Sequence, residues 1–241
     1  MLKNINYPEV TFDEINHKYY NQKGDEYISC TTLIKKFCPK FDKLTISNQV
    51  AKKQGRSQND VLAEWERIAK EATDYGTLIH KCIEGWIKGK PDYIHSDYKD
   101  ITRVGYDILI DNLQPHTPIK SEMLLWNHEY KIAGQSDIVQ MYTNKAGDTI
   151  INIADIKTNK RIEFGSDYGE DMLAPLQHIS HCNYHTYSMQ LSTYAYMLQK
   201  MYPEAKINKM FLLHLDKTNK WTIIPLPYMK LEVMAMLRKN S

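Results

Sequence analysis

One short segment, residues 153–157 (IADIK), places a carboxylate and an amine two positions apart. Alternate side chains of a β-strand point to opposite faces, so Asp155 and Lys157 share one face, while Ala154 and Ile156 share the other. A charged pair at the end of a buried strand costs free energy, so this spacing is compatible with a catalytic site. An ordinary ion pair at a strand end would produce the same spacing.

Two further carboxylates lie on the preceding strand-like segments. Pairing of 131–142 with 148–157 as a hairpin would bring Asp137 close to Asp155, and neighbouring carboxylates repel and raise each other's pKa. A divalent cation offsets that repulsion, and oxygen-rich sites favour Mg²⁺ or Mn²⁺. Glu122 adds a third carboxylate one strand earlier. Alternatively, Asp137 is a turn or strand-edge residue and Glu122 an exposed edge residue.

A helical segment places Gly76, His80 and Glu84 at i, i+4 and i+8, on one stripe. Gly76 lacks a side chain, so a backbone or a phosphate can approach it closely. His80 can offer a neutral imidazole to a metal, although taken alone the pattern is more typical of a packed core histidine. For Glu84 we expect an ion pair with Lys81 or Lys88.

A later helix carries Gln190 and Tyr194 on one face, again four residues apart. An amide and a phenol in that arrangement can hold a phosphate or position the lysine. They can equally be polar groups on a helix surface.

The elements that must position these residues follow from hydrophobic periodicity and turn residues. Ser57 with Asp60 is typical of a helix N-terminus, the segment 73–76 is predicted to interrupt that helix, and 89–91 to end it. The order predicts one α/β domain with a mixed sheet and a helical N-terminal part preceded by a β-hairpin. The predicted strands are 10–12, 17–20, 26–29, 119–126, 131–142, 148–157, 207–215 and 220–225; the predicted helices lie within 31–56 and at 57–72, 77–89, 96–112, 184–202 and 228–238; and 163–182 is predicted to be a long loop.

The composition narrows the class of protein. The 241 residues are 42% hydrophobic and 25% charged, with a net charge of +2, as in globular chains. The sequence contains no apolar run of about 18 residues, so no membrane span is predicted, and the first residues show no secretory signal. Four scattered cysteines indicate reduced thiols, so we expect a cytoplasmic protein. The segment 31–70 holds nine basic and four acidic residues, and with Phe37, Phe41 and Trp65 it predicts either a channel for single-stranded nucleic acid or a core with a basic rim.

Five motifs follow one another along the chain: Gly76 to His80, Glu122, the segment 134–137 (GQSD), the segment 155–157 (DIK) and Gln190 to Tyr194. Their order resembles the PD-(D/E)XK nuclease superfamily, in its RecB-like branch. Residues 27–32 (YISCTT) are also similar to the opening of the phage and mitochondrial genome-maintenance exonucleases of that branch. The resemblance implies a restriction-endonuclease-like core with a central mixed sheet flanked by helices. It implies one nuclease domain over 1–241, with an N-terminal part (1–72) and a catalytic core (73–241).

The resemblance also implies roles for the residues. His80, Asp137 and Asp155 would bind one or two Mg²⁺ or Mn²⁺ ions, with Glu122 as a direct or water-mediated ligand. Lys157 would orient or activate the attacking water and stabilise developing charge. Gln190 and Tyr194 would lie beside the scissile phosphate, near Gly76. Members with an iron–sulfur cluster carry four cysteines in an arrangement that Cys30, Cys38, Cys82 and Cys182 do not match, so no cluster is expected.

The function that follows is a metal-dependent deoxyribonuclease, most readily an exonuclease on single-stranded DNA or DNA ends in replication, recombination or repair. A flap endonuclease of the same superfamily and a catalytically inactive nucleic-acid-binding module are the alternatives. The expected setting is the cytoplasm of a bacterial or phage-infected cell. The expected partners are DNA, single-stranded or with a free end, and a recombination or replication protein, and no membrane is expected.

Overall fold

The computed structural model describes residues 9–240; the first six residues, where no secretory signal is expected, lie outside that range. The chain begins with an antiparallel β1–β2–β3 meander, as the sequence predicts. A glycine in the left-handed region, Gly24 with φ +86°, closes the second turn. The three strands are β1 (Val10–Asp13), β2 (Lys18–Asn21) and β3 (Glu26–Ser29).

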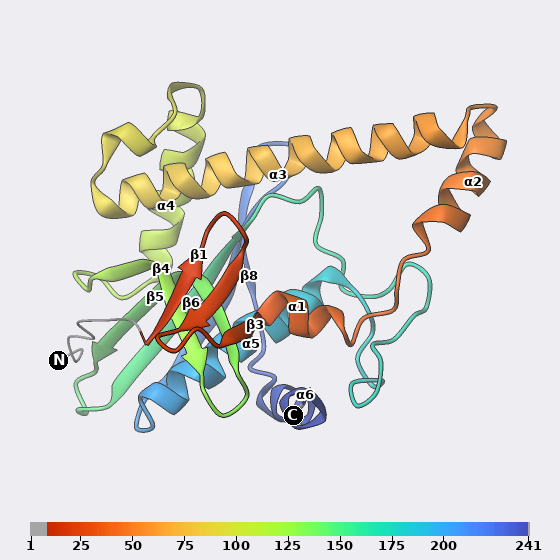
Figure 1. Cartoon of the computed structure of the whole chain (residues 1–241). Coiled ribbons are helices and arrows are strands. Elements are labelled where there is room, and N and C mark those ends of the chain that lie inside the picture. Colours follow the sequence, from red (N-terminus) through yellow and green to blue (C-terminus); the bar gives the residue numbers. More distant parts are fainter. Residues whose placement is uncertain (1–8, 241) are drawn as a thin grey trace.

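The central sheet is mixed, with β5 at its centre (Figure 1). β3 pairs with the start of β5 in parallel, while β4 lies antiparallel along the other edge of β5. The later part of β5 pairs antiparallel with β6, which pairs in parallel with β7, and β8 completes the edge. The predicted strands are confirmed, with bounds β4 (Ile119–Asn127), β5 (Ile132–Thr143), β6 (Thr149–Lys157), β7 (Lys206–Leu215) and β8 (Trp221–Pro225).

Helices cover both faces of this sheet. Ile138 faces α3 and α4, where it packs in one buried cluster with Ile79 and Leu109. The next residue, Val139, points to the other face and belongs to a cluster with Leu191 of α5. The helices are α1 (Cys30–Lys35), α2 (Lys43–Gln54), α3 (Gln58–Lys88), α4 (Lys99–Asn112), α5 (Asn183–Met201) and α6 (Lys230–Asn240), with short 3₁₀ turns at Pro91–Tyr93 and Ser96–Tyr98.

The predicted interruption at 73–76 is wrong, because α3 runs unbroken from Gln58 to Lys88. A single glycine in a helix costs about 1 kcal/mol, which packing elsewhere along the helix can offset. Gly76 instead serves a close approach, since a Cβ there would lie 3.2 Å from Thr158 Oγ1. The boundary expected between residues 72 and 73 therefore falls inside one helix. The predicted ends are confirmed: Ser57 accepts a hydrogen bond from the Asp60 N–H, and Gly89 caps the C-terminus.

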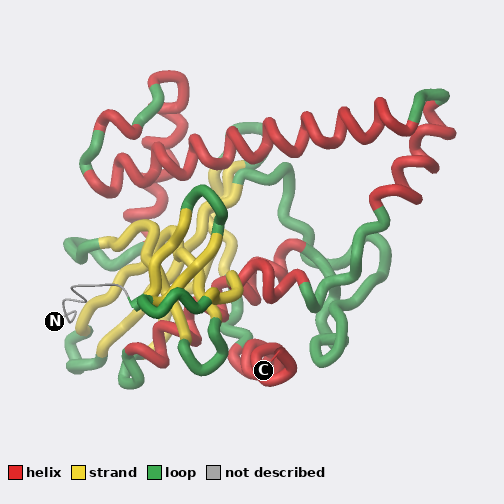
Figure 2. The backbone as a smooth tube through the Cα atoms, in the orientation of Figure 1, coloured by secondary structure: helices red, strands yellow, loops and turns green. Residues whose placement is uncertain are grey.

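The N-terminal half of α3 extends beyond the sheet and carries α2 with it, forming an arm (Figure 1). The predicted long loop, 163–182, lies beside the linker between α1 and α2, where the Leu173 N–H donates to the Phe37 carbonyl at 2.7 Å (Figure 2). Met172 and Leu176 of this loop are buried in the main core, which anchors it. Within residues 9–240, no helix is long and apolar enough to cross a membrane. The prediction of an α/β fold with a central mixed sheet, flanking helices and an N-terminal hairpin is confirmed, and it is consistent with a restriction-endonuclease-like core.

Candidate metal centre and active-site groove

The sheet register aligns three carboxylates across three neighbouring strands. The pairing on both sides of Glu122 in β4 places it opposite Asp137 of β5. The last β5–β6 pair is Ile138 with Ala154, so Asp137 and Asp155 are the next positions on their strands. Like charges at opposite positions of a sheet are destabilising, so this row of carboxylates is costly in the absence of a counter-charge.

The sheet opens at this row of carboxylates. Beyond Ile138, β5 continues toward β3, whereas β6 continues beside β7, so the two strands diverge. The Ile156 N–H, released from the β5–β6 ladder, donates to Asp137 Oδ2 at 2.8 Å. Glu122 adopts φ +51°, which is uncommon for a residue with a side chain and often marks a functional site. The divergence thus exposes the edge of the cluster that a paired sheet would bury.

Helix α3 contributes a nitrogen donor to the same point. His80 Nδ1 lies 3.3 Å from Asp137 Oδ2. Donor atoms of His80, Glu122 and Asp137 all lie within 4.8 Å of one another, so one ion could contact all three. The carboxylate oxygens suit Mg²⁺ or Mn²⁺, and the added imidazole nitrogen suits Mn²⁺ or another first-row transition-metal ion. Asp155 is not part of this three-residue group; its Oδ2 forms an ion pair with Lys157 Nζ.

The electrostatics of the carboxylate cluster favour the binding of a cation. Burial, followed by the charges of Asp137 and Glu84, raises the pKa of Glu122 to about 7. Burial and the Asp137 carboxylate also raise the pKa of Asp155, against the opposing effect of Lys157. A divalent cation between these carboxylates would relieve the repulsion that causes both shifts. The donor atoms and their electrostatic state therefore fit a metal ion.

Lys157 is held in place from two sides. Its ammonium pairs with Asp155 and lies 4.7 Å from the centroid of the Tyr187 ring, which adds a cation–π contact. Burial acts to lower the pKa of Lys157, but Asp155 and Asp137 outweigh it and raise that pKa above its ordinary value. The side chain is therefore a fixed cation, which suits charge stabilisation better than proton abstraction.

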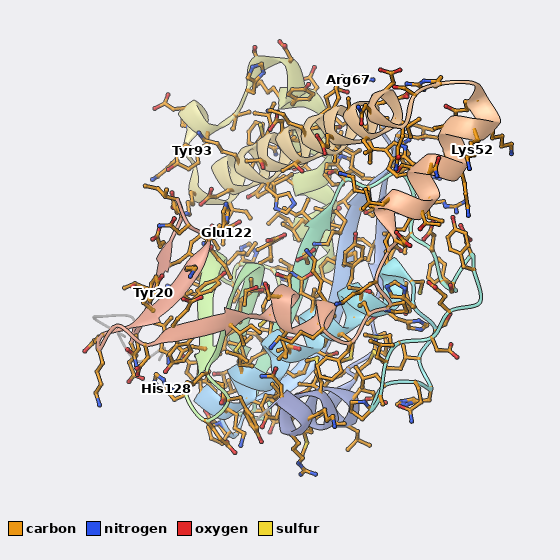
Figure 3. All side chains as sticks on the ribbon, turned by 45° about the vertical axis from the view of Figure 1, so that its right-hand side comes forward. Tyr20, Lys52, Arg67, Tyr93, Glu122 and His128 are labelled. Carbon is orange, nitrogen blue, oxygen red and sulfur yellow. The ribbon has the colours of Figure 1, made fainter. Side chains whose placement is uncertain are left out.

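His80, Glu122 and Lys157 line one groove of about 1250 Å³ between α3 and the N-terminal hairpin, whereas Asp137 and Asp155 lie behind them and are not part of its lining. Glu122 lies between these two walls (Figure 3). The predicted residues Gly76, His80, Glu122, Lys157 and Gln190 all line the groove. Sequence reasoning did not assign a function to several other residues in its lining: Phe12, Glu14, His17, Thr31, Lys81, Lys88, Tyr93 and Gln135.

The spacing of α3 could have revealed one of these additional residues. Lys88 lies four residues after Glu84 and eight after His80, on the same helical stripe. The expected ion pair between Glu84 and Lys88 is present, and both side chains face the groove. No sequence signal indicated Phe12 or His17, because their position in the groove depends on where the hairpin packs.

The predicted pair on α5 is divided between the groove and the core. Gln190 lines the groove, and its amide donates to the Tyr194 hydroxyl at 3.1 Å. Tyr194 is buried against the backbone of Gly134, where a Cβ would lie 2.6 Å from the Tyr194 ring. Burial raises the pKa of Tyr194 well above its ordinary value. Tyr194 therefore positions the Gln190 side chain through this hydrogen bond, and it does not line the groove itself.

The basic segment 31–70 does not form one continuous aromatic channel. Phe37 is a core residue, whereas Phe41 contacts Trp65 near the α2–α3 arm, with ring centroids 6.0 Å apart. Several of its cations are paired with acids, including Lys43 with Glu66. A second cavity of about 680 Å³ lies beside Phe41, and its lining includes Asp42, Glu163, Asp167 and Glu170. These carboxylates make that cavity a poor path for phosphates.

No family model matches the sequence, and no curated protein matches it. Among solved structures, the chain is similar to a "putative exonuclease" from Eubacterium rectale, with 14% identity over 68% of this chain and a TM-score of 0.39. The match spans 64% of the length of that protein. It is also similar to the protein SSO0001, with 18% identity over 68% of this chain and 72% of the other, and a TM-score of 0.27. Similarity at this level does not establish a shared family.

Proposed function

We propose that the protein is a divalent-metal-dependent nuclease that hydrolyses DNA phosphodiester bonds. The observation that supports this proposal is the convergence of His80, Glu122 and Asp137 within 4.8 Å of one another, beside the Asp155–Lys157 pair and in an open groove. His80, Asp137, Asp155 and Glu122 would hold one or two Mg²⁺ or Mn²⁺ ions. When bound, such an ion supplies a Lewis acid for the phosphate and lowers the pKa of a bound water.

The residues of the chain supply the remaining catalytic functions. Lys157 is a protonated amine held by Asp155, and it would stabilise the negative charge that grows on the phosphate in the transition state. Lys81 and Lys88 line the α3 wall of the groove and would contact neighbouring phosphates. Gln190, positioned by Tyr194, would donate its amide hydrogen to the phosphate. The attacking group in this proposal is water.

The α3 wall of the groove, from Thr73 to Lys88, continues N-terminally into the arm of α3 and α2 (Figure 1), and we take this arm to favour an exonuclease that accepts single strands or free ends. End-labelled linear single-stranded DNA and a closed single-stranded circle test this proposal. Each is incubated with Mg²⁺, Mn²⁺ or EDTA and separated on a denaturing gel. We expect metal-dependent degradation of the linear DNA only, with the label pattern giving the polarity.

A matched pair of variants separates the enzyme from a contaminant. Lys157→Met removes the half-buried ammonium but keeps most of the side chain, whereas Lys160→Met removes one exposed lysine just beyond the same strand, outside the groove. We expect the first to lose activity and the second to retain it. Equal activity in both variants would refute the assignment of Lys157. Cleavage of the circle would indicate an endonuclease, and DNA binding without cleavage by wild-type protein would indicate an inactive binding module.

A further inference from the structure

The N-terminal hairpin forms the wall of the groove opposite α3. Phe12, Glu14 and His17, from the end of β1 and the β1–β2 turn, line the same cavity as His80 and Glu122. In Figure 1 the β1–β2 turn points toward α3, across the sheet. Any substrate that reaches the carboxylate cluster through this groove therefore passes between the hairpin and α3.

This turn presents aromatic rings on a firm base. Phe12 stacks on Tyr19 of β2, with ring centroids 4.8 Å apart, and Tyr19 is buried. The rings of His17 and Phe12 lie in an edge-on arrangement, with their centroids 5.8 Å apart, and the His17 side chain is exposed. The Asp13 carboxylate accepts hydrogen bonds from the Ile15 and Asn16 N–H groups, both at 3.0 Å, which fixes the turn. The rings are thus held in place before any ligand arrives.

The two walls differ in chemistry. On the α3 wall, Lys81 provides a cation that attracts phosphates, whereas the charge of Lys88 is paired with Glu84. The hairpin wall offers Phe12 and His17 but also the Glu14 carboxylate, which disfavours a phosphate there. A strand that satisfies both walls has its sugar-phosphate backbone along α3 and its bases turned toward the hairpin.

We propose that Phe12 and His17 form a nucleobase-binding platform in the active-site groove. This inference rests on the proposed nuclease function and specifies its substrate as a single strand, because a base that stacks on protein rings must be unpaired and unstacked from its neighbours. Stacking on aromatic side chains uses the π-face that every base has, so the platform is tolerant of sequence. It holds the base of a nucleotide near the scissile phosphate.

The test measures binding without cleavage. Fluorescence anisotropy in EDTA gives the affinity for a labelled short oligothymidylate and for an abasic strand of equal length, which keeps the phosphates and lacks the bases. We expect wild-type protein to favour the thymidylate. In Phe12→Leu, which keeps an apolar side chain on Tyr19, and in His17→Gly, which suits the φ of +50°, thymidylate affinity should fall about tenfold. Affinity for the abasic strand should not change.

A control variant and a separate assay keep the outcomes distinct. Phe164→Leu removes a ring that is 63% exposed and lies outside this groove, and it should bind both strands as wild type does. An unchanged preference for thymidylate in both hairpin variants, or no preference in wild type, would overturn the platform. Metal-dependent cleavage by the wild-type protein, measured in parallel, decides the nuclease proposal independently of that result.

Discussion

The raised pKa of Glu122 predicts that this residue destabilises the metal-free protein at neutral and alkaline pH. In the unfolded chain this carboxyl has an ordinary pKa near 4.5, and in the folded chain burial and the neighbouring carboxylates raise it to about 7. The folded state therefore binds the proton more tightly, so stability falls as the pH rises from about 4.5 to 7 and stays low above that. At 1.36 kcal/mol per pKa unit the full shift corresponds to about 3 kcal/mol, and solvent screening of this partly exposed group reduces it to about 2 kcal/mol.

Substitution of Glu122 by Gln removes this penalty. In EDTA at pH 8, Glu122→Gln should be about 2 kcal/mol more stable than wild type toward urea, with little difference near pH 4.5. Saturating Mn²⁺ should reduce or reverse the advantage, because the ion neutralises the wild-type cluster. The exposed carboxylate Glu204 provides the control, and Glu204→Gln should change stability by less than about 0.5 kcal/mol at either pH. A Glu122→Gln variant no more stable than wild type at pH 8 would refute this electrostatic reasoning.

Three further predictions concern the same site. Lys157→Ala should abolish turnover in an activity assay. It also leaves the buried Asp155 carboxylate unpaired, so the free energy of unfolding, measured by urea titration, should fall by about 1–3 kcal/mol at pH 8 and by less at pH 5. Asp155→Ala should weaken Mn²⁺ binding in titration calorimetry, and unchanged binding would argue against Asp155 as a ligand. Gly134→Ala should lose about 1–3 kcal/mol of stability because its Cβ would meet the Tyr194 ring, whereas Gly165→Ala, with open space around it, should stay close to wild type in the same unfolding measurement.

Several parts of the fold were predictable because their signals are local. The turn at Gly24, the cap at Ser57 and the apolar, strand-forming segments of β4, β5 and β6 involve residues close together in the chain. The incorrect break in α3 has a physical reason as well. Gly76 lowers helix propensity, but propensity is a weak preference that tertiary packing overrides.

The sequence by itself selected the residues that we propose to carry the chemistry. Two acids and a lysine at fixed spacing on predicted strands, with a histidine on a helical stripe, could be selected because strand and helix periodicities are properties of the local backbone. Asp137 near Asp155 was predictable for the same reason, since a short hairpin links their strands. The tertiary structure alone decided that Glu122 lies opposite Asp137, that the Tyr194 ring packs against Gly134 of β5, and that the N-terminal hairpin faces α3 across the groove. These contacts join segments far apart in the chain. They depend on strand pairing and on how the helices pack on the two faces of the sheet, which no local pattern in the sequence determines.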